Sequence, residues 1–440
     1  MKPNARLIAY NVLLKIFKDN AYSNLALDAA LKESRLDLRD KAFASALVYG
    51  VCERLVTLDY ALSAHLSKPI SKLKIQVLTI LRLGAYQLLF MESVPSSAAV
   101  NESVSLSKKV GCSYACGLIN AVLRNLDRNG FALPDEKDAA QFLSIKYSCP
   151  QWLVEKWLCE YGAEKAESIL SCSVKSDRLT VRVNTLKTTT DSLCERFKSK
   201  GIECEKGIAA DSLLLGSLPC SIEELEEFKS GLFHVQGIPS QLCAEALGAK
   251  EGDTVFDLCA APGGKTFTIA QIMNNKGIIR AFDLYEGRVS LIKKGASRLG
   301  LGIVEAAVGN ASVFDPSLEE SADCVLCDVP CSGLGIISKK PEIKFKNPKD
   351  FASLPEIQYE ILQNCSRYVK KGGRLVYSTC TLSRAENEDV CHRFEKNNPE
   401  FRAEKPFETV SQDCFATVFP SKNNSDGFFT ALFIKEGAND

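Results

Sequence analysis

Apolar residues recur at helical spacing through the amino-terminal part of the chain. The spacing is clear at Ile8, Val12 and Ile16 and repeats in the window 41–54. A helix gathers residues three or four positions apart on one face, which it can bury against its neighbours. We therefore expect residues 1–140 to form a compact all-α bundle.

Residues 145–235 combine helical and strand patterns. A helix is expected at 150–158, a strand at 179–183 and a second helix at 189–200, and another strand begins at 201–204. This mixture predicts a small α+β module that follows the bundle.

Short apolar runs alternate with helical patterns from residue 251 onward. Strands are expected at 254–258, 278–283, 303–308, 323–328 and 373–378, with a late hairpin-like pair near 415–420 and 428–434. The alternation is typical of a doubly wound α/β fold with a mostly parallel sheet. By pattern, the chain divides into domains at 1–140, 145–235 and 236–440.

The ligands of such sheets bind beyond the carboxyl ends of the strands. The residues that we expect to converge there are 259–265, Asp283, Asn310, 328–332 and 378–381. Two of these strand ends carry what the chemistry needs: 328–332, which contains Asp328 and Cys331, and 378–381, which contains Cys380.

The stretch 254–266 reads TVFDLCAAPGGKT, an apolar strand that ends in an acid and breaks into a Pro/Gly turn before a short helix. Such a loop exposes backbone N–H groups to a ligand. A nucleoside triphosphate site would need a glycine where Cys259 stands, and no arrangement of Gly263 and Gly264 gives the G-x-G-x-x-G of a dinucleotide site. The remaining candidate is an adenosine-type ligand without a pyrophosphate, such as S-adenosylmethionine.

An acid for the ribose of that ligand is present. Asp283 ends the second expected strand, 26 positions after Asp257, where nucleotide-binding α/β folds carry their ribose carboxylate. The alternative interpretation is an ordinary tight strand-to-helix turn followed by a surface aspartate.

The composition is that of a multidomain globular protein. The chain has 440 residues, of which 46% are hydrophobic and 25% charged, enough for two or three domains. The longest apolar stretch, 75–91, is interrupted by Gln76, Arg82 and Gln87, so we expect a core helix and no membrane segment. Eighteen cysteines without a signal peptide favour free thiols in the cytoplasm.

Charge and histidine content narrow the possible chemistry. The net charge is zero, but residues 60–130 hold eight Lys or Arg against three acids. That excess is either an RNA-binding surface or an ordinary solvated helix face. None of the three histidines, His65, His234 and His392, has a second histidine at ligand spacing. Cysteine and carboxylate must therefore carry any reaction.

Cys324, Cys327 and Cys331 have the spacing C-x-x-C-x-x-x-C, which invites a metal-cluster interpretation. Cys324 and Cys327 lie in an apolar strand at an odd separation, so their side chains should point to opposite faces. We therefore expect no metal, and we interpret these two cysteines as small core residues.

Cys331 and Cys380 each follow a strand in a polar turn, where a thiol would solve a chemical problem. Carbon 5 of a pyrimidine attacks a sulfonium methyl group poorly, but addition of a thiolate to carbon 6 turns the ring into an enamine. Because a free cysteine has a pKa of about 8.5, the site must lower that pKa or supply a base. Asp328 suits another role, to hold the N3/N4 edge of cytosine and to stabilise the cation that forms. Two cysteines and one aspartate fit cytosine C5 methylation without a histidine.

Three motifs carry a resemblance to a known family. The stretches 257–265 (DLCAAPGGK), 328–333 (DVPCSG) and 377–381 (YSTCT) resemble the signature motifs of the Nop/Sun RNA cytosine-C5 methyltransferases, and the bundle with 120–124 (NAVLR) resembles a NusB-like RNA-binding domain. Together they are similar to the bacterial ribosomal small subunit methyltransferase B group over nearly the whole chain. The resemblance implies a Rossmann-like class I methyltransferase sheet preceded by the all-α bundle and the small α+β module.

The resemblance also implies roles for individual residues. Asp328 would be catalytic, Cys380 the nucleophile, and Cys331 the thiol that serves product release. Cytosine C5 enzymes that act on DNA use the Pro-Cys thiol for attack instead, so the exchanged assignment stays open. The implied cofactor-binding residues are Cys259, Ala260, Ala261, Pro262, Gly263, Gly264, Lys265, Asp283, Arg288, Asn310 and Asp328.

The implied substrate is a cytosine of 16S ribosomal RNA, in an unassembled or partly assembled small subunit, methylated by a monomer. The chain departs from the family pattern at Asn310, where an aspartate is usual, and at Gly237, where an aspartate often follows Gln236. We expect weaker cofactor binding from the first change. Two other classes stay open: an RNA-binding or antitermination protein that retains the sheet, and an RNA methyltransferase that acts at another base position.

Overall fold

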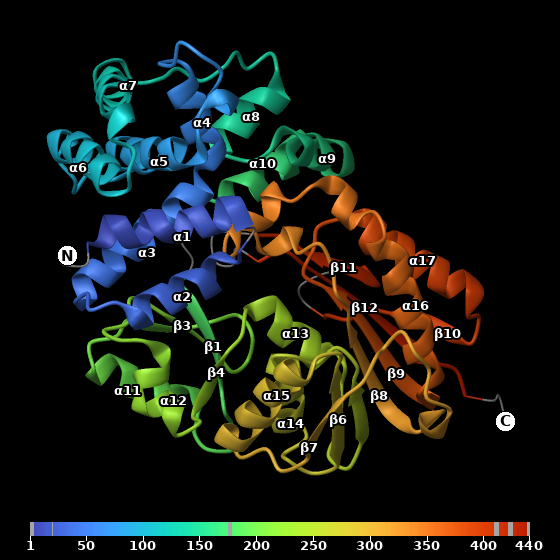
Figure 1. Cartoon of the computed structure of the whole chain (residues 1–440). Coiled ribbons are helices and arrows are strands. Elements are labelled where there is room, and N and C mark those ends of the chain that lie inside the picture. Colours follow the sequence, from blue (N-terminus) through green and yellow to red (C-terminus); the bar gives the residue numbers. More distant parts are fainter. Residues whose placement is uncertain (1–3, 20, 175–177, 409–412, 421–425, 438–440) are drawn as a thin grey trace. The chain divides into compact units, whose positions relative to one another are not determined.

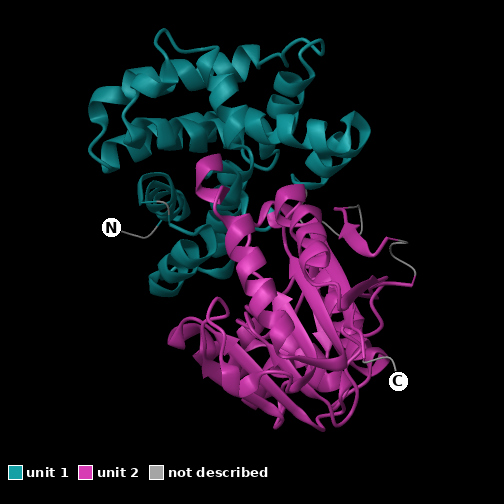
Figure 2. Cartoon of the chain, turned by 90° about the vertical axis from the view of Figure 1, so that its right-hand side faces the viewer, with its two compact units in different colours: residues 1–175, 337–346 teal, residues 176–336, 347–440 magenta. Residues whose placement is uncertain are grey.

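The computed structural model describes residues 4–19, 21–174, 178–408, 413–420 and 426–437 (Figure 1). The chain forms two compact units (Figure 2). Unit 1 takes in residues 1–175 and 337–346, and unit 2 takes in residues 176–336 and 347–440.

Unit 1 is helical, as the apolar spacing predicts. In α7 the residues Ile119, Val122, Leu123 and Leu126 are buried, which is the stripe of an amphipathic helix. Its α-helices are α1 (Ala5–Asp19), α2 (Ser23–Glu33), α3 (Leu38–Glu53), α4 (Leu55–Ser63), α5 (Ile75–Phe90), α6 (Ser96–Lys109), α7 (Cys116–Asn129), α8 (Ala139–Tyr147), α9 (Gln151–Tyr161) and α10 (Ala163–Cys172).

The long apolar stretch forms the core helix α5, as expected. Arg82 on this helix is buried and pairs with Asp59, with Nη2 and Oδ2 2.6 Å apart. Counting Arg82 in the basic surface was therefore wrong, because its charge is already balanced inside the unit. No helix in the described ranges is long and apolar enough to cross a membrane.

The segment 337–346 belongs to unit 1 although it follows the Pro-Cys motif of the sheet in sequence. Its Lys344 is buried and donates from Nζ to the carbonyl oxygens of Glu53, at 2.8 Å, and of Ser148, at 2.6 Å. Burial lowers the pKa of Lys344 to about 8. Glu342 accepts hydrogen bonds from the backbone N–H and the hydroxyl of Ser23. The sequence pattern did not predict this excursion of the chain.

Unit 2 opens with a small antiparallel sheet in the order β2-β3-β1-β4. Its strands are β1 (Leu179–Val183), β2 (Cys204–Lys206), β3 (Ser212–Leu215) and β4 (Phe233–Val235), accompanied by α11 (Thr190–Ser199) and α12 (Glu226–Lys229). The sequence indicated β1, α11 and the start of β2, and it missed β3 and β4. The helices α9 and α10, which fall within the range 145–235 expected for the module, lie in unit 1.

The larger sheet of unit 2 has the order β10-β12-β9-β8-β5-β6-β7, with β11 paired to β12. Strands β9, β8, β5, β6 and β7 are parallel, and β12 runs antiparallel to β9. The predicted doubly wound, mostly parallel sheet is therefore confirmed. The strands are β5 (Thr254–Asp257), β6 (Ile278–Asp283), β7 (Val304–Val308), β8 (Ala322–Asp328), β9 (Val369–Thr379), β10 (Phe401–Glu404), β11 (Phe415–Val418) and β12 (Phe428–Lys435).

Two hydrophobic clusters cover the two faces of this sheet. One includes Cys324 and the other Cys327, which confirms that the two thiols point to opposite faces. Helices α13 (Ile238–Ala246), α14 (Gly264–Ile272) and α15 (Glu286–Leu299) contribute to the first cluster, and α16 (Leu354–Arg367) and α17 (Glu388–Asn397) to the second. Because β5, β8 and β9 are neighbours, their carboxyl ends lie side by side.

Candidate active site

The glycine loop between β5 and α14 depends on glycine at position 263. Gly263 has φ of +108°, and a Cβ built there would lie 2.3 Å from the ring of Phe267. Only glycine adopts this positive φ without strain and leaves room for the ring of Phe267. Position 263 is the N-cap of α14, so the loop leads directly into the N-terminal end of that helix.

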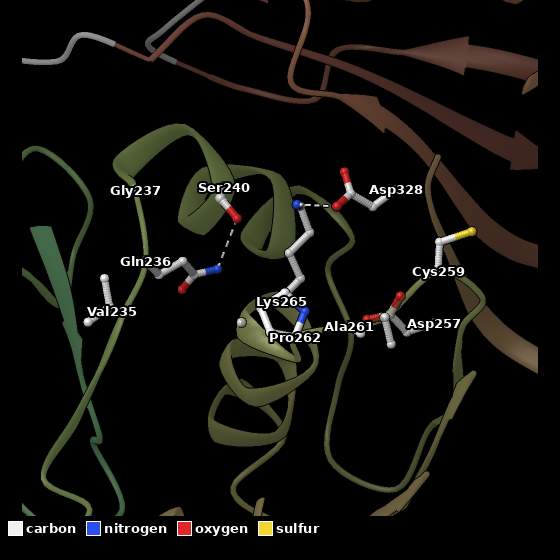
Figure 3. Close-up of a pocket in the computed structure, with 12 residues that line it drawn as sticks. Val235, Gln236, Gly237, Ser240, Asp257, Cys259, Ala261, Pro262, Lys265 and Asp328 are labelled. Carbon is white, nitrogen blue, oxygen red and sulfur yellow. Dashed lines mark hydrogen bonds and ion pairs between the residues drawn. The ribbon is translucent and has the colours of Figure 1, made fainter. Parts of the chain in front are cut away.

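The loop forms one side of a cavity of about 170 Å³ (Figure 3). Sequence reasoning assigned no role to Gln236 or Ser240, although both line it and Gln236 Nε2 donates to Ser240 Oγ. The signal available was the position of Gln236 between the strand β4 and the helix α13, and of Ser240 in the first turn of that helix, whose N-cap is Gly237. The lining residues are Val235, Gln236, Gly237, Ser240, Asp257, Cys259, Ala260, Ala261, Pro262, Gly264, Lys265 and Asp328.

Asp257 supplies an observation that fits a cationic ligand group in this cavity. Its Oδ2 accepts a 2.6 Å hydrogen bond from the hydroxyl of Thr266, whereas its buried Oδ1 has no hydrogen-bond partner among the described residues. Burial raises the pKa of Asp257 to about 7. Asp257 lines the cavity, and a buried carboxylate there suits the amino group of S-adenosylmethionine.

Lys265 and Asp328 both line the cavity and form an ion pair with each other, as Figure 3 shows. The Nζ of Lys265 lies 2.7 Å from Oδ2 of Asp328, and the hydroxyl of Ser378 donates to Oδ1 at 2.7 Å. Burial alone would lower the pKa of Lys265, but the charge of Asp328 raises it above its ordinary value. The carboxylate is therefore held in one orientation by two donors.

Asp283 and Arg288 meet the glycine loop at Ala261. Asp283 is buried and accepts from the backbone N–H of Ala261 at 3.3 Å, and Arg288 donates to the carbonyl of Ala261 at 2.8 Å. The carboxylate and the guanidinium also pair, at 3.3 Å. Neither side chain lines the 170 Å³ cavity, and neither does Asn310, which is exposed and accepts from the backbone N–H of Ser312.

Replacing Asp283 with alanine should raise the dissociation constant of S-adenosylmethionine at least tenfold. The substitution removes a carboxylate that would accept from the ribose hydroxyls and that also holds the loop at Ala261. Isothermal titration calorimetry measures the change. Asn310→Ala is the graded comparison and should weaken binding less than Asp283→Ala, because Asn310 is exposed whereas Asp283 is buried against the loop. An Asp283→Ala protein that binds the cofactor with unchanged affinity would contradict the assignment of the ribose acid.

Cys331 and Cys380 come from the adjacent strands β8 and β9 and meet beyond their ends. Their sulfurs are 3.3 Å apart, and both residues are partly exposed. The contact with Cys380 and burial raise the pKa of Cys331 well above its ordinary value. The pair can therefore share one proton, and each thiol can serve the other as a partner in proton transfer.

The other cysteine and histidine of the site are poor candidates for chemistry. Burial raises the pKa of Cys259 well above its usual range, and its sulfur points away from Lys265 in Figure 3. Burial lowers the pKa of His234 to about 3, so this histidine stays neutral where its Nε2 lies 3.1 Å from Oε1 of Gln236. A general base or nucleophile must come from the Cys331–Cys380 pair or from a carboxylate.

Family models match three successive parts of the chain. The model of the NusB family matches residues 3–128. A model described as the ferredoxin-like domain of RsmF/B-like methyltransferases matches residues 149–223, and one described as 16S rRNA methyltransferase RsmB/F matches residues 244–434.

Similar proteins extend over the full chain. A Bacillus subtilis (strain 168) protein named probable ribosomal RNA small subunit methyltransferase B is 38% identical over 448 residues, covering 99% of this chain and 100% of the relative. A Synechocystis protein of the same name is 34% identical, covering 98% and 99%.

Solved structures agree with the fold. The crystal structure of PH0851 superposes with a TM-score of 0.82 at 26% identity, covering 98% of this chain and 99% of that one. The structure of NSun6 from Pyrococcus horikoshii has a TM-score of 0.60 at 25% identity, covering 66% of this chain and 99% of that one.

Proposed function

The chain belongs to the ribosomal RNA small subunit methyltransferase B family, and we propose that it methylates carbon 5 of a cytosine in 16S ribosomal RNA through a covalent bond between a cysteine and carbon 6. The coarser activity, methylation of ribosomal RNA with S-adenosylmethionine as donor, follows from membership of that family. The observation that carries the finer proposal is the meeting of two thiols beyond adjacent strand ends, with Asp328 at the end of one of those strands. A methyltransferase acting on an exocyclic nitrogen would need neither thiol.

The cofactor has a suitable place between the glycine loop and Gln236. The backbone of 259–264 and the carboxylate of Asp257 suit its amino acid part, and Asp283 suits its ribose. When bound, S-adenosylmethionine supplies an electrophilic methyl group on a sulfonium sulfur. We assign supporting contacts to Arg288, which fixes Ala261, and to Asn310.

Asp328 suits the recognition of the cytosine ring. With Lys265 and Ser378 orienting its carboxylate, its remaining lone pairs can accept from the N3/N4 edge of the base. As a thiolate adds to carbon 6, an electron pair moves toward N3, which takes up a proton from solvent to give a neutral enamine. Transfer of the methyl group to carbon 5 then leaves positive charge shared by N3 and N4, which a carboxylate stabilises. The same charge excludes Asp328 from lowering the pKa of the nearby thiols, because a negative neighbour disfavours a thiolate.

The two thiols have different roles: Cys380 attacks the ring, and Cys331 helps to release the product. The thiolate of Cys380 attacks carbon 6 of a cytosine that has been flipped out of its stack, and carbon 5 gains the electron density that it needs to accept a methyl group. Cys331 then assists the removal of the carbon 5 proton, after which the bond between Cys380 and carbon 6 breaks and the product leaves. No histidine takes part.

We assign RNA binding to the helical residues 1–140. The protein would act as a monomer in the cytoplasm, and its substrate would be the RNA of the free or partly assembled small subunit. The exposed basic residues of the window 60–130 support this assignment of RNA binding. Arg82 is buried and is not one of them. Phosphate contacts from such residues give affinity without sequence specificity. The set is Lys68, Lys72, Lys74, Lys108, Lys109, Arg124 and Arg128.

RNA that contains 5-fluorocytosine should trap the protein in a covalent complex that survives denaturing electrophoresis and depends on S-adenosylmethionine. Fluorine at carbon 5 cannot leave as a proton does, so the thiol adduct at carbon 6 cannot eliminate. Methylation of ordinary RNA without a trapped complex would favour another base position. The absence of methylation altogether would favour the RNA-binding alternative. Bisulfite sequencing of 16S RNA from a deletion strain identifies the cytosine.

A further inference from the structure

Glu386 and Asn387 are consecutive, buried and polar, and neither has a role in the chemistry above. Glu386 is 3% exposed and Asn387 is fully buried. They lie between the end of β9 and the start of α17. A buried carboxylate is costly unless it is fully hydrogen-bonded, so its partners indicate its purpose.

Glu386 holds the loop that carries Cys331. Its Oε2 accepts from the backbone N–H of Ser332 at 2.9 Å, and its Oε1 accepts from the hydroxyl of Ser332 at 2.6 Å. Gln358 donates from Nε2 both to Oε2 of Glu386 and to the carbonyl of Pro330, each at 3.0 Å. The residues on both sides of Cys331 are therefore tied to one carboxylate.

Asn387 holds the loop that carries Cys380 in the same manner. Its Oδ1 accepts from the hydroxyl of Thr379 at 2.6 Å, and its Nδ2 donates to the carbonyl of Thr381 at 3.1 Å. These two threonines flank Cys380 and are fully buried. The asparagine amide therefore spans the second thiol as the carboxylate spans the first.

The two halves are joined directly. The hydroxyls of Ser332 and Thr381 lie 2.7 Å apart, and Tyr377 donates from its hydroxyl to the carbonyl of Glu386 at 2.5 Å. Because Ser332 already donates to Glu386, Thr381 must donate to Ser332. One connected network of buried groups therefore sets the two loops against each other, and the 3.3 Å contact between the sulfurs lies between them.

We propose that Glu386 and Asn387 are positioning residues that fix the separation of the two thiols, so that both can act in turn on carbons 6 and 5 of one ring. The hydrogen-bond network is independent of the proposed function, but the catalytic purpose that we give it rests on that function. The side-chain types are specific. The groups that face the carboxylate of Glu386 are all donors, and only a carboxylate can accept hydrogen bonds at both of its oxygens. The side chain of Asn387 faces one donor and one acceptor, and only an amide can pair with both.

The isosteric exchanges Glu386→Gln and Asn387→Asp test this directly. Each keeps the shape of the side chain but sets like groups against each other, donor against donor in the first and acceptor against acceptor in the second. Ser332→Ala is a milder variant that removes only the bridging hydroxyl. Asn398→Ala is the matched control, because Asn398 is a buried asparagine at the other end of α17 whose side-chain amide donates to the carbonyl of Phe394 in that helix.

The readout is the rate at which Cys331 and Cys380 form a disulfide with diamide in the full chain without RNA. Two thiols lose two protons and two electrons, and diamide takes them up as its hydrazine. Peptide mapping by mass spectrometry separates this bond from other oxidised cysteines. Sulfurs already 3.3 Å apart should cross-link quickly. We expect each isosteric variant, and to a smaller degree Ser332→Ala, to slow the reaction at least tenfold relative to Asn398→Ala, while S-adenosylmethionine affinity changes less than twofold.

A second readout connects geometry with chemistry. The same variants should lower the rate of covalent adduct formation with 5-fluorocytosine RNA by at least tenfold. Cross-linking at the wild-type rate in both isosteric variants and in Ser332→Ala would overturn the proposal, whatever their turnover. If the wild-type protein never forms the RNA adduct while the variants still slow the cross-link, the proposed C5 chemistry fails and the positioning role stands.

Discussion

Cys380→Ala should give neither methylated RNA nor a covalent complex, whereas Cys331→Ala should accumulate protein bound covalently to its RNA. The first substitution removes the nucleophile, without which carbon 5 has too little electron density to react. Turnover should fall by a factor on the order of 10⁴ or more. The second leaves attack and methyl transfer intact but removes the group that helps to release the product.

Denaturing electrophoresis of each variant with labelled RNA, with and without S-adenosylmethionine, measures both effects. The Cys331→Ala complex should depend on the cofactor, because release becomes limiting only after the methyl group has been transferred. Cys204→Ala, at a buried cysteine in strand β2 of the small sheet, is the control for loss of a thiol. The opposite pattern, with the adduct accumulating in Cys380→Ala and lost in Cys331→Ala, would exchange the two roles and give the assignment used by DNA enzymes.

Asp328→Asn should lower the single-turnover rate by about 10³-fold while binding of RNA and cofactor changes far less. The asparagine keeps the shape of the side chain and can still accept from Ser378. It sets an NH₂ group against the ammonium of Lys265 or against the N3–H of the activated ring, and it carries no charge to stabilise the cation. The loss should therefore fall on the chemical step.

Single-turnover measurement with saturating RNA and cofactor separates that step from binding. Ser378→Ala is the graded comparison, since it removes one hydrogen bond to Oδ1 and leaves the charge of Asp328 in place. We expect a loss of about tenfold from it. An Asp328→Asn protein within tenfold of the wild-type rate would mean that the ring is held by other groups and that Asp328 is only the partner of Lys265.

Local patterns were enough to predict the helices of the bundle and the strands that form the site. The helical spacing of Ile8, Val12 and Ile16 in α1 and the apolar runs of β5, β6 and β8 depend only on the period of a helix or strand. The turn at 262–264 follows from the backbone preferences of proline and glycine. The opposite orientation of Cys324 and Cys327 also follows from strand geometry, and the structure confirms it.

Which side chains meet was decided by the path of the chain. Asp328 lies 63 positions from Lys265, and Cys331 lies 49 positions from Cys380. Their proximity follows from the strand order β9-β8-β5, which the sequence indicated only as convergence at one edge of a sheet.

Other partners left no periodic signal at all. By itself, the sequence of this protein determined its helices, its parallel strands and the turn of its glycine loop, because those depend on neighbours in the chain. Only the tertiary structure shows that Arg82 is buried in a pair with Asp59 and that Lys344 packs in the helical unit. It also shows that Glu386 and Asn387 hydrogen-bond to the loops that carry Cys331 and Cys380. A buried polar group takes its role from the donors and acceptors that surround it, and these come from segments whose separation in sequence carries no pattern.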